Sequence, residues 1–174
     1  KHMEVKSTLQ VVNEASLKAQ RGVTEGQTIK PLVGHGERPT DRIRTAFATY
    51  EAGTVEALHW HPIEAFYFVV SGHATVRNIE GEEFEVGPGS YIYAPPGLAG
   101  AHEWEVKEGL QLLSGRAWTE SVRKMQFTVD KKTKRSYIDI DELARRGGLS
   151  FKRHYCSPPA PPPFLSALSP APFG

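Results

Sequence analysis

From residue 42 onward, hydrophobic and polar residues alternate in short runs that turn residues interrupt. Runs of this kind, rich in β-branched and aromatic side chains and bounded by Gly, Pro, Asn or Asp, predict β-strands. Strands are expected at Arg42–Tyr50, Val55–His61, Ala65–Val70, His73–Asn78, Glu83–Val86, Tyr91–Ala94, His102–Val106 and Leu110–Trp118. Their even spacing, without a helical period between them, predicts an all-β domain in the form of an antiparallel sandwich or small barrel.

The segment before residue 42 shows a weaker pattern. It is mixed and polar, with extended candidates at Leu9–Val12 and Thr28–Val33, and glycines and a proline then break the pattern. We therefore expect an N-terminal arm over residues 1–40, followed by the β-barrel over residues 41–130.

Three further elements are expected near the end of the chain. Met125–Val129 predicts one more strand. Asp139–Arg146 predicts a helix within a C-terminal segment over residues 131–155, because an acidic cap opens it, arginines close it and Gly147 follows. Residues 156–174 are Pro-rich and lack periodicity, which is typical of a disordered tail or of an extended polyproline arm laid on a neighbour.

Composition narrows the class of protein. A chain of 174 residues with 39% hydrophobic and 24% charged residues is typical of one globular domain. The formal net charge of +1 provides no basic field for nucleic acid or for an anionic membrane. Cys156 is the single cysteine, so no intrachain disulfide can form, and no apolar run approaches the roughly 20 residues that span a bilayer. With no signal peptide after Met3, we expect a cytoplasmic protein that binds neither nucleic acid nor membrane.

The strongest chemical signal is His59-Trp60-His61, two histidines one residue apart. Residues i and i+2 of a β-strand point to the same face, so Val55, Ala57, His59 and His61 should share one side. The two imidazoles then project into one space and can converge on a metal ion. His102 opens a later strand, after Pro95-Pro96-Gly97, and in an antiparallel barrel it can lie beside the pair. Surface positions or ordinary hydrogen bonds are expected for the remaining histidines, His2, His35, His73 and His154.

These patterns resemble the two motifs of the cupin family. Residues 53–72 read G-x5-H-x-H with a glycine eleven residues after the second histidine, which is similar to the first motif. Residues 89–97 read G-x5-P-x-G with a histidine following, which is similar to the second. The resemblance covers about residues 42–118. It implies a single antiparallel β-barrel of jelly-roll type, with a metal in its mouth held by His59, His61 and His102.

Two positions depart from those motifs. The second motif places its histidine at Gly100, and a lengthened loop before His102 accounts for the shift of two residues. The fourth ligand of the family, usually glutamate, falls on Ala65, which cannot bind metal. Glu64 is adjacent, but strand alternation turns it to the opposite face, and it ligates only if a bulge shifts the strand. A three-histidine site is therefore expected, with Glu64 as the alternative ligand.

Neighbouring side chains complete the expected site. Tyr67 and Trp104 should face inward and hold a planar substrate near the metal. Further lining is expected from Phe47 or its neighbours and from Tyr91 or Tyr93. Arg116 is a candidate partner for a substrate carboxylate. The candidate catalytic residues are thus Tyr67, Trp104, Glu64 and Arg116.

The resemblance implies a metal-dependent enzyme. Three neutral imidazoles leave a divalent ion its positive charge and open coordination positions. We expect Fe(II), with Mn, Ni and Zn as alternatives, in a dioxygenase that uses O2 to cleave a small oxygenated organic substrate. The alternatives are a Lewis-acid lyase, isomerase or decarboxylase, and a non-catalytic cupin that binds a small molecule or stores a metal. Phe66, Phe68 and Val70 should face outward, and an apolar outer face of this kind predicts a homodimer.

Overall fold

The computed structural model describes residues 6–117 and 126–138. The strands are β1 (Gln20–Arg21), β2 (Gln27–Val33), β3 (Ile43–Tyr50), β4 (Val55–Trp60), β5 (Ala65–Ser71), β6 (Ala74–Asn78), β7 (Glu83–Val86), β8 (Tyr91–Ala94), β9 (His102–Val106), β10 (Leu110–Ala117), β11 (Phe127–Val129) and β12 (Ser136–Tyr137). Two short 3-10 turns accompany them, η1 (Glu14–Ser16) and η2 (Leu98–Gly100). In these two ranges, no helix is long and apolar enough to cross a membrane. The expected helix at Asp139–Arg146 and the Pro-rich tail lie outside the described residues.

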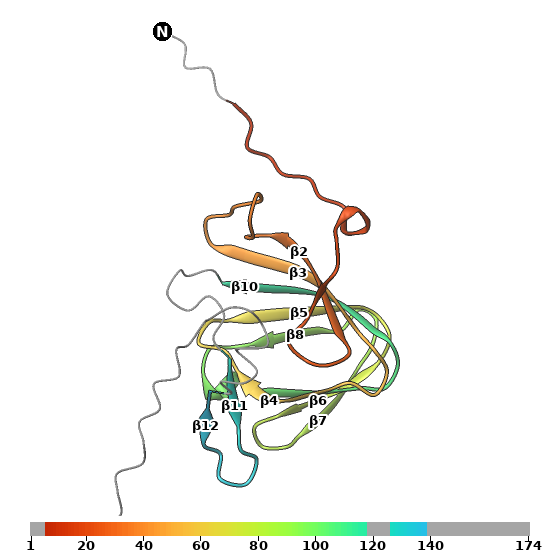
Figure 1. The fold of residues 1–174 in the computed structure, drawn as a ribbon. Helices are drawn as coiled ribbons and strands as arrows, with labels where there is room; N and C mark the ends of the chain where they lie inside the picture. The colour runs from red at the N-terminus through yellow and green to blue at the C-terminus, as the bar shows by residue number, and fades with distance from the viewer. Residues whose placement is uncertain (1–5, 118–125, 139–174) are drawn as a thin grey trace, which may run out of the picture.

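The strands form two antiparallel sheets that face each other (Figure 1). One sheet has the order β1-β2-β3-β10-β5-β8, and the other has the order β12-β11-β4-β9-β6-β7. The sheets do not close on one another. The expected all-β jelly-roll architecture is confirmed, in the form of two layers around a common interior.

The first sheet begins earlier in the chain than the strand pattern suggested. β2 pairs with β3 from Gln27 opposite Tyr50 to Val33 opposite Thr45, so part of the expected N-terminal arm is a strand of this sheet. Leu9–Val12 forms no strand, and the side chains of Leu9 and Val11 are 84% and 90% exposed. A short extended run without a pairing partner or a surface to cover it has no source of stability.

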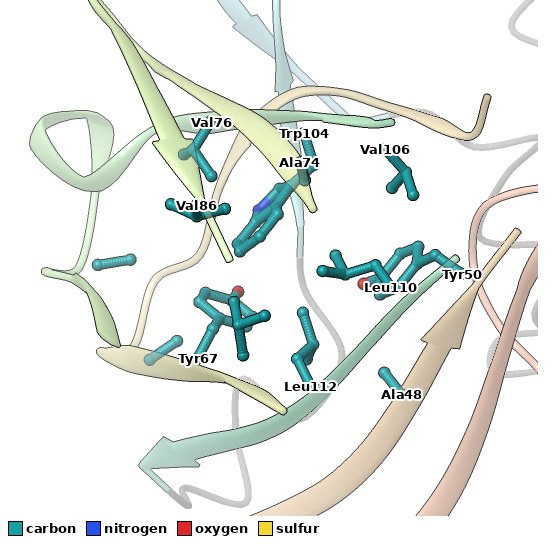
Figure 2. Packing of buried hydrophobic residues seen from close by; sticks show 13 residues of the cluster. Ala48, Tyr50, Tyr67, Ala74, Val76, Val86, Trp104, Val106, Leu110 and Leu112 are labelled. Carbon is teal, nitrogen blue, oxygen red and sulfur yellow. The ribbon is translucent and has the colours of Figure 1, made fainter. Parts of the chain in front are cut away.

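The core lies between the sheets, where Figure 2 shows aliphatic side chains packed around three large rings. Leu110 and Leu112 of β10 are 0% and 1% exposed. Tyr67 of β5 and Trp104 of β9 reach toward each other from opposite sheets, with ring centroids 5.4 Å apart at 69°. Edge-to-face pairs of this kind stabilise a core by about 0.5–1.5 kcal/mol beyond the area they bury.

Alternate side chains of β5 point to the outer face of the first sheet, away from the core. Val69 is fully buried, whereas Phe68 and Val70 are 40% and 44% exposed, so the expected outward direction of this set is confirmed. Phe66 stacks on Tyr91 of β8 on the same outer face, with ring centroids 5.5 Å apart.

Candidate metal centre

Three buried histidines meet in the interior. His59 and His102 are directly opposite each other in the ladder between β4 and β9, and His61 directly follows β4. One ring nitrogen from each of the three lies within 4.8 Å of the other two, and the residues are 1% to 4% exposed. The structure therefore brings together the three residues that the sequence predicted as metal ligands.

A β-bulge in β4 orients the first two histidines. In the ladder with β9, Glu56 lies opposite Trp104 and His59 opposite His102, so three steps along β4 match two steps along β9. Such an extra residue changes which side chains face inward. Val55 and Ala57 are exposed while His59 and His61 are buried, so the expected alternation of all four residues on one face is wrong.

Backbone carbonyls set the tautomers of two imidazoles. Nδ1 of His59 lies 2.7 Å from the carbonyl oxygen of Ala57, and Nδ1 of His102 lies 2.8 Å from that of Gly100. A carbonyl oxygen only accepts, so each Nδ1 carries the proton and each Nε2 keeps its lone pair. Hydrogen bonds of this kind commonly orient histidine ligands in metal sites.

The turn before β9 is tied to the histidine pair. The backbone N–H of Gly97 donates to the carbonyl oxygen of His61 over 2.8 Å. The following 3-10 turn, η2, is the expected lengthened loop, and it delivers His102 to the start of β9. A Cβ on Gly100 would lie 1.8 Å from the carbonyl oxygen of Pro95, so this tight path admits only glycine.

The electrostatics of the cluster favour neutral imidazoles. Burial, and secondarily the neighbouring His59, lower the pKa of His102 to about 3. At neutral pH this imidazole is uncharged, which is the form that binds metal. Three nitrogen donors with lone pairs directed into one space fit a divalent transition-metal ion.

Tyr67 stands beside the cluster. Its hydroxyl oxygen lies 3.2 Å from Nε2 of His102 and 3.5 Å from Nε2 of His61. Burial raises the pKa of Tyr67, and the charge of Arg116 opposes this effect. A hydrogen bond from Arg116 to Tyr67 also lowers the pKa of Tyr67. The structure thus places Tyr67 and Arg116, two of the expected catalytic residues, together beside the histidines.

Trp104 faces the same interior. It is 2% exposed, and its ring centroid lies 6.5 Å from that of His102. Arg116 pairs with Ala65 across β10 and β5, so it shares the inner face with Ala65 and Tyr67. Both residues therefore belong to the wall of the histidine cluster.

Glu64 is not at the cluster. It is exposed, and its carboxylate accepts a hydrogen bond from the hydroxyl of Tyr93 over 2.9 Å. Tyr91 and Tyr93 are 61% and 56% exposed, and Phe47 alternates with the buried Ala48. The expected lining by Phe47, Tyr91 or Tyr93 is wrong, because strand parity turns all three to the outer face.

A surface hollow of about 790 Å³ lies on that outer face. Glu64, Phe66, Tyr91 and Tyr93 line part of it, and none of the three histidines does. The hollow thus shares Arg116 with the wall of the histidine cluster, although it includes none of the three histidines.

One buried carboxylate near the histidines was missed from the sequence. Glu56 is 6% exposed, and its Oε1 lies 3.7 Å from Nε2 of His59. Strict alternation along β4 places Glu56 opposite to His59. Only the bulge brings the two side chains to one face, and no local signal in the sequence marks it.

An antiparallel β-sandwich with three converging buried imidazoles defines a protein with a candidate metal-binding centre. Residues 46–116 match the model of the cupin domain family. The match includes all three histidines and confirms the resemblance seen in the motifs. No curated protein sequence matches the chain.

Solved structures share the fold. The polyketide cyclase RemF from Streptomyces resistomycificus matches with a TM-score of 0.61 at 19% identity, over 71% of this chain and 87% of that one. KdgF from Halomonas sp. matches with a TM-score of 0.53 at 21% identity, over 63% and 94%. The DMSP lyase DddQ from Ruegeria pomeroyi DSS-3 matches with a TM-score of 0.54 at 18% identity, over 64% and 60%. At these identities the likeness concerns the fold alone.

Proposed function

We propose that this protein is a metal-dependent cupin enzyme that acts on a small oxygenated organic substrate by Lewis-acid chemistry, with Tyr67 as its proton-handling residue. The position of the Tyr67 hydroxyl, 3.2 Å and 3.5 Å from Nε2 of His102 and His61, carries this proposal. A divalent ion held by the three histidines would polarise a carbonyl or carboxylate oxygen. Lyases and isomerases need a group beside that oxygen which gives or takes a proton.

The residues around Tyr67 suit that role. Arg116 hydrogen-bonds to Tyr67, so its guanidinium stabilises negative charge on the phenol oxygen when the proton leaves. The same cation can pair with a substrate carboxylate at the inner face of β10. Trp104, which is 2% exposed, excludes water from this side of the cluster. The site thus favours a small carboxylate-bearing substrate.

The Fe(II) dioxygenase expected from the sequence is the second candidate. Its support is the donor set: three imidazoles, with Ala65 at the motif's usual carboxylate position, leave room at the metal for a chelating substrate and O2. Both candidates use the same three histidines. They differ in whether the metal must change its redox state.

The test compares metals and atmospheres. Metal-free protein is loaded with Fe(II) or Zn(II) and incubated with a panel of small hydroxy acids, keto acids and catechols, with and without air. Product formation is followed by NMR and oxygen consumption by an electrode. Turnover with zinc that persists without air supports the Lewis-acid reading. Turnover with iron alone, coupled to oxygen consumption, contradicts it and supports the dioxygenase, whereas metal binding without turnover of any compound favours a binding protein.

A further inference from the structure

The carboxylate of Glu56 is held in a defined position. Oε1 lies 3.7 Å from Nε2 of His59, and Oε2 accepts a hydrogen bond from the Tyr50 hydroxyl over 3.3 Å. Tyr50 in turn accepts from Nε2 of Gln27 over 2.5 Å, and all of these side chains are buried. The chain Gln27–Tyr50–Glu56 therefore orients one carboxylate oxygen toward the histidines, as outer-sphere partners do for metal ligands.

This carboxylate needs a positive charge close to it, because a buried anion without one is strongly destabilising. Among the residues that the structure describes, the basic group within ion-pair distance of it is the imidazole of His59, which carries no charge when neutral. The bond from Nδ1 of His59 to Ala57 leaves the lone pair of that ring at Nε2, so Oε1 and Nε2 meet as two acceptors. A metal ion satisfies them together with His61 and His102.

The distance agrees with shared ligation. Two neighbouring ligand atoms that each lie about 2.0–2.2 Å from one metal ion are about 2.8–3.1 Å apart in octahedral sites and about 3.3–3.6 Å apart in tetrahedral sites. The observed 3.7 Å between Oε1 and Nε2 is closed by a small rotation of the glutamate side chain. We propose that Glu56 is the fourth protein ligand of the centre and replaces the carboxylate that is missing at Ala65. This inference rests on the metal site of the proposed function.

Metal affinity and spectroscopy test it without a substrate. The full chain is stripped of metal and titrated with Co(II), and the dissociation constant is measured by competition with a chelator. Glu56→Gln should weaken binding at least about tenfold and change the intensity of the Co(II) visible bands, because the anionic ligand is lost. Glu56→Asp should weaken binding similarly, because its carboxylate is one methylene shorter. Glu64→Gln is the matched control and should leave affinity and spectrum unchanged, since that carboxylate lies on the outer face.

The outcomes separate this inference from the site itself. If His102→Ala loses Co(II) while Glu56→Gln keeps wild-type affinity and bands, the metal site stands and Glu56 is not a ligand. If Glu56→Asp keeps wild-type affinity while Glu56→Gln loses it, the carboxylate acts through its charge and the inference is overturned. If wild-type protein binds no Co(II), both proposals fail. Thermal unfolding of each metal-free variant verifies the fold. If Glu56→Gln does not fold, the Co(II) affinity of Glu56→Asp tests the inference instead.

Discussion

Nδ1 of His102 donates its proton to the carbonyl oxygen of Gly100 over 2.8 Å, so the loop before β9 sets the direction of a metal-facing imidazole. The same loop has no room for a side chain at residue 100, because a Cβ there meets the carbonyl oxygen of Pro95 at 1.8 Å. The position of the third histidine thus depends on a close backbone approach.

Gly100→Ala should therefore destabilise the fold by about 2–3 kcal/mol and weaken Co(II) binding. Gly109→Ala is the control, since a Cβ at residue 109 meets its nearest atom, the carbonyl oxygen of Tyr50, at 3.9 Å. Urea unfolding and Co(II) titration measure the two effects. Wild-type stability of Gly100→Ala would show that the loop relaxes without cost.

Tyr67→Phe should separate catalysis from metal binding. It removes a hydroxyl 3.2 Å from Nε2 of His102 and keeps the ring that packs on Trp104. We expect turnover of any substrate found in the panel to fall about 10²-fold or more, with Co(II) affinity unchanged. Tyr93→Phe, on the outer face, should keep full turnover. Undiminished turnover of Tyr67→Phe would exclude a role for its hydroxyl in proton transfer.

An ion-pair network on the outer side of β6 and β9 stabilises the sheet that carries His102. The buried carboxylate of Glu103 lies 3.1 Å from Nη1 of Arg77 and also contacts Lys131. Arg77→Met should lower the free energy of unfolding, because it removes one partner of a buried carboxylate together with the pairs of Arg77 to Glu83 and Glu105. Lys107→Met breaks the more exposed pair with Glu105 and should change stability little. Equal losses of the two variants in urea unfolding would contradict the larger contribution expected of Arg77.

Glu105 makes part of that stability dependent on pH. Hydrogen bonds from Lys107 and then from Arg77 lower the pKa of Glu105 to about 2. A carboxyl with a lowered folded-state pKa stabilises fully above its unfolded value of about 4.5 and loses this contribution as the pH falls toward 2. The difference in thermal midpoint between wild type and Glu105→Gln should shrink between pH 5 and pH 2.5. A constant difference would contradict the assignment of the shift to these bonds.

The homodimer remains a prediction, with a second copy of the chain as the partner of the outer face of the first sheet. Phe68 and Val70 are exposed there, and the adjoining hollow is lined by acidic Asp41 and Glu64 and by basic Arg42. A patch that is apolar and carries both signs of charge can pair with its own copy around a two-fold axis. Phe68→Glu should convert a dimer to a monomer in sedimentation velocity, whereas Val55→Glu, on the other sheet, should not. A monomeric wild type would refute the prediction.

Local patterns along the chain were sufficient to identify the main strands, the all-β class and the three histidines. Each depends on short-range information: alternation over a few residues, turn residues between the runs, and the i, i+2 spacing of His59 and His61. Trp104 shares a strand face with His102 by the same rule, and its inward direction followed from parity alone. The outward direction of Glu64 also followed from strand parity.

The tertiary structure decided those contacts around the histidines that no local pattern indicates. The bulge that turns Glu56 toward His59 arises because β4 and β9, far apart in sequence, pair with one extra residue on β4. β2 belongs to the first sheet because it pairs with β3. The weak hydrophobic pattern of β2 alone does not indicate this pairing. Tyr67 meets His61 and His102 because the two sheets face each other across the core. Strand propensity and spacing are local properties, whereas register and the packing of one layer on another depend on contacts between distant segments.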